Sequence, residues 1–229
     1  AVGTPRAVAT PDFAPLPGAF MPGAAPAPGA LPYTVWLGNL HSQTNHSDGG
    51  ADVASCRSAQ RPQSAPYGPA DAFAYARGRG LDILVASEHN HMFDGSPGSA
   101  PDADPAAARA LYRAGLTAAS TFSAQHPGFL ALYGLEWGVI EKGGHINIFN
   151  SDELLGWETN ASGAPFADTI TPRSDYAALY TLMRQRGWVG QFNHPAPAGQ
   201  FQVGGVPLAY TEDGGAAMVL CEVMNTSAF

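Results

Sequence analysis

The sequence predicts an α/β domain built on a parallel β-sheet, either open or closed into a barrel. Apolar runs of strand length alternate along the chain with segments of helical pattern, which is the order expected of successive β–α–β units. The mostly apolar run Leu81–Ser87 is typical of a strand buried on both faces of such a sheet. Histidine or glutamate residues follow several of these runs. In such folds, functional groups gather at the carboxyl ends of strands.

Four elements are predicted in the first half of the chain. One helix has Pro69 in its first turn, where proline is tolerated, and Gly80 as the residue that stops it. The other helix is long and rich in alanine. The four elements are the strand Thr34–Leu40, the helix Pro69–Arg79, the strand Leu81–Ser87 and the helix Ala106–Gln125.

Five further elements are predicted in the second half. An amphipathic helix is expected to be capped by Ser174, whose hydroxyl can accept a bond from a backbone N–H, and to end at Gly187. The five elements are the strands Phe129–Leu135 and His145–Phe149, the helix Asp175–Arg186, and the strands Trp188–Phe192 and Met218–Met224.

Composition excludes several classes of protein. The chain has 229 residues, of which 45% are hydrophobic and 13% charged, so it is expected to fold around one sizeable core. The net charge is -8 with only 11 Lys and Arg residues, which argues against binding to nucleic acid. No apolar run reaches the roughly 18 residues of a membrane span. We therefore expect a small-molecule substrate, with no nucleic acid or membrane as partner.

Residues 1–32 are rich in Ala, Pro and Gly and are expected to form an extended arm before a domain over residues 33–229. The chain opens with Ala1 and not with Met, which fits a mature exported protein and fits trimming equally well. We expect export to the periplasm or the medium. Cys56 and Cys221 are either two buried thiols or, in an exported protein, a disulfide; a thiolate metal pair is the least favoured reading.

The segment 39–50 carries the first cluster of candidate metal ligands. His41 and Gln43 lie two residues apart on an emerging strand, so their side chains should point to the same side. Asp48 then returns from a turn that ends in two glycines. Imidazole nitrogen and carboxylate oxygen are ligands that Zn²⁺, Mn²⁺ and Fe²⁺ accept. The alternative for this cluster alone is an ordinary capped polar turn.

Three more clusters follow later strands. His89 comes after the strand Leu81–Ser87 and is preceded by Glu88, a carboxylate that could orient it. Glu136 ends the next strand and could bridge two metals, with His145 shortly beyond it. In a fourth cluster, Asn193-His194-Pro195, proline is expected to hold the imidazole of His194 in a rigid extended turn. Each histidine by itself is more often a satisfied polar residue, but Glu or His at four separate strand ends makes that reading improbable.

This pattern resembles the polymerase and histidinol phosphatase family, called PHP, from about residue 34 to the end. The segment 41–49 is similar to that family's His-x-His-Thr-x-x-Ser-Asp-Gly signature, and 84–90 to its apolar strand ending in Thr-Asp-His-Asn. Glu136, His145 and Asn193-His194-Pro195 match its later metal positions, and Glu222-Val-Met-Asn225 matches a late Glu-x-x-Asn strand. Within the family, the chain is most similar to the branch that includes carbaryl hydrolase.

The resemblance implies a distorted (β/α)7 barrel with two or three divalent metal ions, Zn, Mn or Fe, at its carboxyl face. Such ions lower the pKa of a bound water, which then attacks a phosphorus or carbonyl centre. By this resemblance, one metal is held by His41 and Glu136, a second by Glu136, His145 and His194, and a third position by Asp48 and His89. The residues expected in catalysis are Glu136, His194 and His89. The residues expected to contact the substrate or support the ligands are Glu88, His91, Glu222 and Asn225.

The chain departs from the family pattern in two ways. Gln43 stands where the family has a second histidine, and an amide oxygen is a weaker metal ligand than imidazole. Glu88 likewise replaces the usual aspartate. The family also has an Asp-x-His motif on its last strand, which this chain does not contain up to Phe229. We therefore expect a barrel that lacks its C-terminal strand or strands, completed by a C-terminal fragment or a second chain.

Three functions are consistent with these residues. The favoured one is a metal-dependent phosphoesterase acting on a phosphomonoester or phosphodiester, with Lys142 and Arg173 as the nearest cations along the sequence. The first alternative is a hydrolase of carbamate, amide or ester bonds with the same metal site, which the low content of basic residues mildly favours. The second alternative is a binding protein in which Gln43 marks weakened catalysis.

Overall fold

The computed structural model describes residues 33–54, 58–139, 143–195 and 199–223. The chain divides into two units, Ala1–Thr34 and Val35–Phe229, and every helix and strand described here belongs to the second. The predicted arm over residues 1–32 lies outside the described residues, as do Cys56, Lys142 and Asn225. Cys221 is an exposed thiol, so the reading of two buried thiols is wrong for this residue, and the alternative of a disulfide involves Cys56, which lies outside the described residues.

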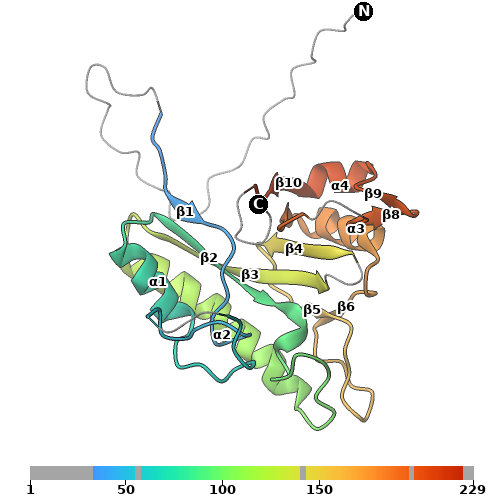
Figure 1. The fold of residues 1–229 in the computed structure, drawn as a ribbon, viewed down its shortest axis with the longest axis horizontal. Helices are drawn as coiled ribbons and strands as arrows, with labels where there is room; N and C mark the ends of the chain where they lie inside the picture. The colour runs from blue at the N-terminus through green and yellow to red at the C-terminus, as the bar shows by residue number, and fades with distance from the viewer. Residues whose placement is uncertain (1–32, 55–57, 140–142, 196–198, 224–229) are drawn as a thin grey trace, which may run out of the picture. The chain divides into compact units, whose positions relative to one another are not determined.

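Six strands of the described chain form one mixed sheet that curls through half a barrel (Figure 1). The first three strands in the sheet are parallel to one another, and so are the last two. The fourth strand, β4, is antiparallel to both of its neighbours. In sheet order, the strands are β1 (Gly38–Asn39), β2 (Ile83–His89), β3 (Leu130–Val139), β4 (Gly144–Phe149), β7 (Val189–Phe192) and β10 (Met218–Cys221).

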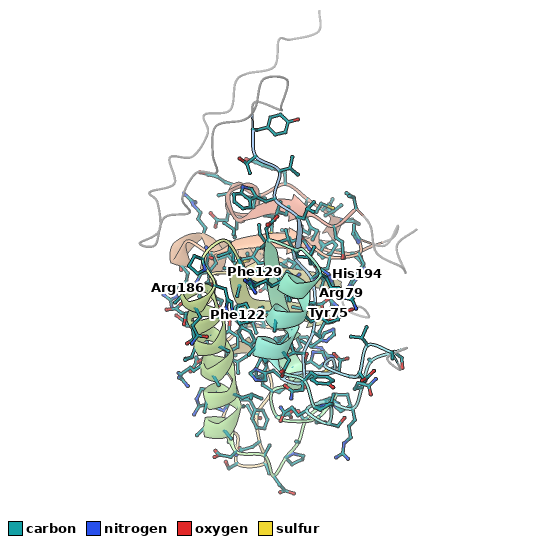
Figure 2. All side chains as sticks on the ribbon, turned by 90° about the vertical axis from the view of Figure 1, so that its left-hand side faces the viewer. Tyr75, Arg79, Phe122, Phe129, Arg186 and His194 are labelled. Atoms are coloured by element: carbon teal, nitrogen blue, oxygen red, sulfur yellow. The ribbon has the colours of Figure 1, made fainter. Side chains whose placement is uncertain are left out.

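One pair of helices packs beside β2 and β3, and another pair lies near β10. Helices α1 (Pro69–Gly78) and α2 (Pro105–Gln125) contact each other and the strands β2 and β3, and Figure 2 shows them side by side. Helices α3 (Tyr176–Arg186) and α4 (Glu212–Ala217) contact each other near β10. The smaller elements are the 3-10 helix η1 (Asn90–Met92) and the two-stranded pairs β5 (Leu155–Gly156) with β6 (Thr169–Ile170) and β8 (Gln202–Val203) with β9 (Val206–Pro207).

The predicted helices are confirmed, with one error in a cap. Helix α1 begins at Pro69, and α3 ends where Gly187 adopts a left-handed backbone with φ of 71°. The predicted cap of α3 is wrong, because Asp175 and not Ser174 accepts the bond from the Ala178 N–H. Ser174 has φ of 64° and precedes the cap by one residue. Carboxylate and hydroxyl are both good caps, so the sequence alone did not separate two adjacent candidates.

The expectation of an all-parallel sheet is wrong at β4. Only a few residues separate β3 from β4, whereas a parallel crossover needs roughly a dozen or more. The two strands therefore pair as neighbours in a hairpin, from Leu135 opposite Ile148 to Val139 opposite Gly144. This pairing also extends β3 beyond its predicted end at Leu135.

The sheet is open in the described residues, so the closed (β/α)7 barrel is not confirmed. Strands β1 and β10 are its two edges, and each is shorter than predicted. Large apolar side chains beside both edges are exposed: Val35, Trp36, Leu37, Val219, Leu220 and Val223. The middle of the sheet is buried, and so are all six residues of β4. None of the helices in the described ranges is long and apolar enough to cross a membrane.

Candidate metal centre

The register of the sheet brings the predicted ligands together at one rim, where its parallel strands end. His89 lies beside Glu136 at the end of the parallel pair β2–β3. Because β4 runs the opposite way, its first residues reach the same rim, and His145 pairs with Gly138. His194 follows the end of β7, and Glu222 follows the end of β10. Chain segments far apart in sequence therefore place their polar side chains around one point.

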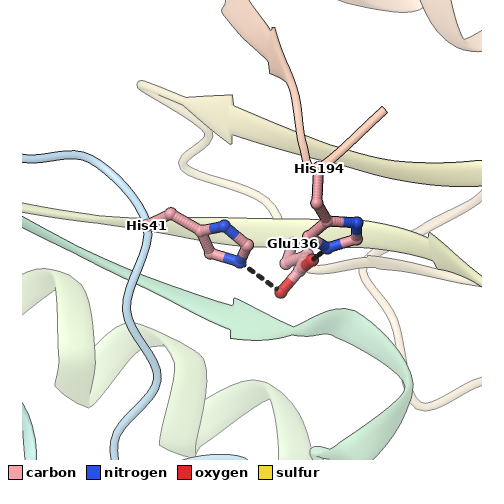
Figure 3. Close-up of side chains that lie close together, drawn as sticks. All are labelled: His41, Glu136 and His194. Atoms are coloured by element: carbon pink, nitrogen blue, oxygen red, sulfur yellow. Dashed lines mark hydrogen bonds and ion pairs between the residues drawn. The ribbon is translucent and has the colours of Figure 1, made fainter. Parts of the chain in front are cut away.

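Glu136 is the centre of this arrangement and is 1% exposed. Each of its two carboxylate oxygens faces nitrogen atoms of other side chains, and Figure 3 shows two of these contacts. Oε1 lies 2.6 Å from Nδ1 of His145 and 3.1 Å from Nε2 of His194; Oε2 lies 2.6 Å from Nε2 of Gln43, 2.8 Å from Nε2 of His41 and 3.3 Å from Nε2 of His89.

Two groups of these side chains could each hold a metal ion, within the residues that the structure describes. One consists of His41, Glu136 and His194, and the other of His89, Glu136 and His145; in each group the ligand atoms lie within 4.8 Å of one another. The expected assignment placed His194 with His145 and left His89 to a third position. In the structure His194 instead joins His41, and His89 joins His145, with Glu136 common to both groups.

Two further carboxylates orient the histidines from behind. Glu222 lies 3.2 Å from Nδ1 of His41, and Asp48 lies 3.0 Å from Nδ1 of His89. A histidine whose Nδ1–H is held by a carboxylate presents the lone pair of Nε2, which is the usual arrangement of a metal-binding imidazole. In both residues that Nε2 faces Glu136, so the donor set fits a divalent metal.

The backbone at His194 is strained, which differs from the extended turn expected of a His-Pro step. Its φ is 26°, in the left-handed region that disfavours a residue with a side chain. The N–H of His194 donates to Oε2 of Glu222 at 2.6 Å, which helps to hold this conformation. Strain of this kind is commonly retained where a side chain must be aimed at a functional site.

The charges of the cluster are strongly coupled. Burial alone would raise the pKa of Glu136, but the charge of His89 and hydrogen bonds from the other histidines hold it well below its usual value. Burial likewise lowers the pKa of His89, but the charges of Glu136 and Asp48 outweigh it and raise that pKa to about 9. Imidazole must lose its proton to bind a metal, so metal binding would release protons here.

Glu88 does not face the centre. It is fully buried and accepts hydrogen bonds from the N–H and hydroxyl of Thr44, at 3.0 and 2.6 Å, and from the hydroxyl of Ser47 at 2.6 Å. Burial raises the pKa of Glu88. The residue expected to support a ligand therefore anchors the turn at 44–47, immediately before Asp48.

A buried set of amides was missed by the sequence reasoning. Asn193 donates to Oδ1 of Asn147 at 2.7 Å, and Asn147 donates to the carbonyl of Leu40 at 2.8 Å. These bonds tie the ends of β1, β4 and β7 together beside His41 and His194. The available signal was that an Asn lies next to His194 and another lies two residues after His145.

His46 and His91 belong to neither group of possible metal ligands. Nδ1 of His46 lies 2.7 Å from the hydroxyl of Tyr133, and burial lowers the pKa of His46 to about 4. The ring of His91 lies 5.7 Å from that of His89 and stacks on Trp157 at 6.3 Å. Its Nδ1 is buried and has no hydrogen-bond partner among the described residues.

A hollow beside the centre begins at His91. The residues that line it include the aromatic side chains of Phe93 and Trp157 and the carboxylates of Asp94 and Glu158. Arg173 lies over the ring of Trp157, with Cζ 5.7 Å from the ring centroid, and its charge acts on His91. The lining of this hollow is therefore partly aromatic and partly acidic.

No protein-family model matches this chain, and a search of curated proteins also returned no match. The interpretation of the site therefore rests on its own geometry.

Proposed function

We propose that this protein is a metal-dependent hydrolase, and that its substrate is a phosphoester. The observation that carries the proposal is the position of Glu136, a buried carboxylate shared by two histidine pairs. Paired metal sites that share a ligand are typical of enzymes that hydrolyse phosphoesters and related bonds.

The residues of the chain would act by holding and orienting. His41 and His194 would hold one ion and His89 and His145 the other, with Glu136 contributing to both. Glu222 and Asp48 fix the tautomers of two of these histidines. Bound divalent ions would supply a water of lowered pKa and polarise the scissile group.

Arg173 supports a phosphoester as the substrate. It is a basic side chain whose charge reaches His91, at the border of the centre. A guanidinium there could contact phosphate oxygens that the metals leave free. The chain as a whole has a formal net charge of -8, which would otherwise disfavour an anionic substrate.

The lining of the hollow supports a second candidate, hydrolysis of a carbamate, amide or ester. Asp94 and Glu158 disfavour a leaving group with a further negative charge, while Trp157 and Phe93 favour an uncharged one. The same centre would serve this chemistry without a cation to hold the substrate.

A substrate panel distinguishes the two candidates. Metal-free protein is reloaded with Zn²⁺ or Mn²⁺ and assayed with a phosphomonoester, a phosphodiester and an aryl carbamate. We expect turnover of a phosphoester that disappears in Glu136→Ala and in His194→Ala. His126→Ala is the matched control, because His126 stacks on Phe122 at the end of α2, and neither metal group includes it. Full activity in either of the first two variants would refute the assignment, and metal binding without any turnover would favour a binding protein.

A further inference from the structure

Gln43 is held as a hydrogen-bond donor at the centre. Its Nε2 lies 2.6 Å from Oε2 of Glu136 and 3.2 Å from the carbonyl oxygen of Ser87. Both of these atoms can only accept when Glu136 is ionised, so the side-chain atom that faces them must be the NH₂ group. Turning the amide around would place an oxygen against two oxygens. The amide oxygen of Gln43 is therefore directed away from the position that a metal ligand would need.

Asp48 is also engaged elsewhere. Its Oδ1 accepts from Nδ1 of His89 at 3.0 Å, and Asp48 belongs to neither group that could hold a metal among the described residues. Glu222 has the same relation to His41 on the other side of Glu136. The two carboxylates therefore have equivalent orienting roles, one for each pair of histidines.

Glu136 already faces five nitrogen atoms of other side chains. A carboxylate offers about four lone-pair directions. The two histidine pairs use both oxygens, and Gln43 donates to Oε2 in addition. The residues expected to form a third metal position, Asp48 and His89, are thus an orienting carboxylate and a member of the second group, and Gln43 is a hydrogen-bond donor.

We propose that Gln43 limits this centre to two metal ions and fixes the carboxylate of Glu136 between them. This inference rests on the proposed function, because it takes the two histidine groups to be metal sites. Gln43 is a positioning residue: it acts on the metals through Glu136 and does not bind them.

The test is a metal count that does not depend on activity. Metal-free protein is saturated with Zn²⁺, separated from free metal and analysed for zinc per chain, and affinity is measured by competition with a chelator. We expect two ions in the unaltered protein. Gln43→Leu should keep two ions and weaken affinity by about tenfold, which is the usual effect of losing a group that supports a ligand.

A second variant tests the limit itself. Gln43→His places an imidazole nitrogen, a strong ligand, beside Glu136. We expect the count to rise from two to three. The matched control is Gln63→Leu, because Gln63 also donates its amide to two oxygens, the carbonyls of Met92 and Phe93, and neither metal group includes it. Its count and affinity should be unchanged.

The outcomes separate this inference from the proposed function. Three ions in the unaltered protein, or the loss of an ion in Gln43→Leu, would show that Gln43 is a ligand and overturn the inference alone. An unchanged count of two in Gln43→His would overturn the claim that Gln43 sets the limit. Failure of the unaltered protein to bind any zinc would refute the metal centre, and this inference with it.

Discussion

Replacement of His46 should change how the stability of this protein depends on pH. His46 is partly buried beside Tyr133, and this burial lowers its pKa to about 4, compared with an ordinary value of 6.5. In His46→Asn, the amide can still bond to the Tyr133 hydroxyl, since the Asn side chain reaches the position of Nδ1. The variant therefore keeps the contact and removes the titration.

The sign and size of the effect follow from the difference in pKa. The unfolded chain takes up the proton near pH 6.5, whereas the folded chain resists it until about pH 4, so acid favours unfolding in this interval. At about 1.36 kcal/mol for each pKa unit, the full difference is about 3.4 kcal/mol. Between pH 7 and pH 4, His46 should account for about 3 kcal/mol of lost stability.

The assay is urea unfolding at several pH values between 7 and 4, with a chelator present so that metal binding does not contribute. The free energy of unfolding of the unaltered protein should fall by about 3 kcal/mol more than that of His46→Asn over this range. Other acidic groups titrate in both proteins and cancel in the comparison. A difference between the two proteins that stays constant with pH would refute the buried, neutral state of His46.

One further prediction concerns the support of the centre, and another concerns the packing of the core. Glu222→Gln should weaken zinc binding by roughly 10- to 100-fold in a chelator competition. Glu222 now accepts hydrogen bonds from His41 Nδ1–H and from the His194 N–H, and the NH₂ group of glutamine would face one of these two donors. Equal affinity would argue against the orienting role. Gly115→Ala should lower the free energy of unfolding by about 1–3 kcal/mol, because its Cβ would lie 2.1 Å from the ring of Tyr133. Gly78→Ala, whose Cβ meets nothing within 4 Å, is the control, and equal losses in both would contradict the packing argument.

Local signals in the sequence were sufficient for much of the fold. Pro69 and Gly187 mark a helix start and a helix end because their effect depends on the backbone of one or two residues. The apolar run of β2 also predicted its strand. The direction of β4 was missed, although the short connection after β3 contains the information.

The sequence by itself determined which ligand types this protein offers and that they follow strand ends. Histidines at 41, 89, 145 and 194, with Glu136, are the groups that meet at one rim of the sheet. Only the tertiary structure decided how they pair, and that Gln43 donates to Glu136 and does not offer its oxygen. The physical reason is that hydrogen-bond roles depend on distances of a few ångströms between residues far apart along the chain. His41 and Glu222, which are 181 positions apart, follow the two outermost strands, β1 and β10, and are neighbours only because the sheet curls.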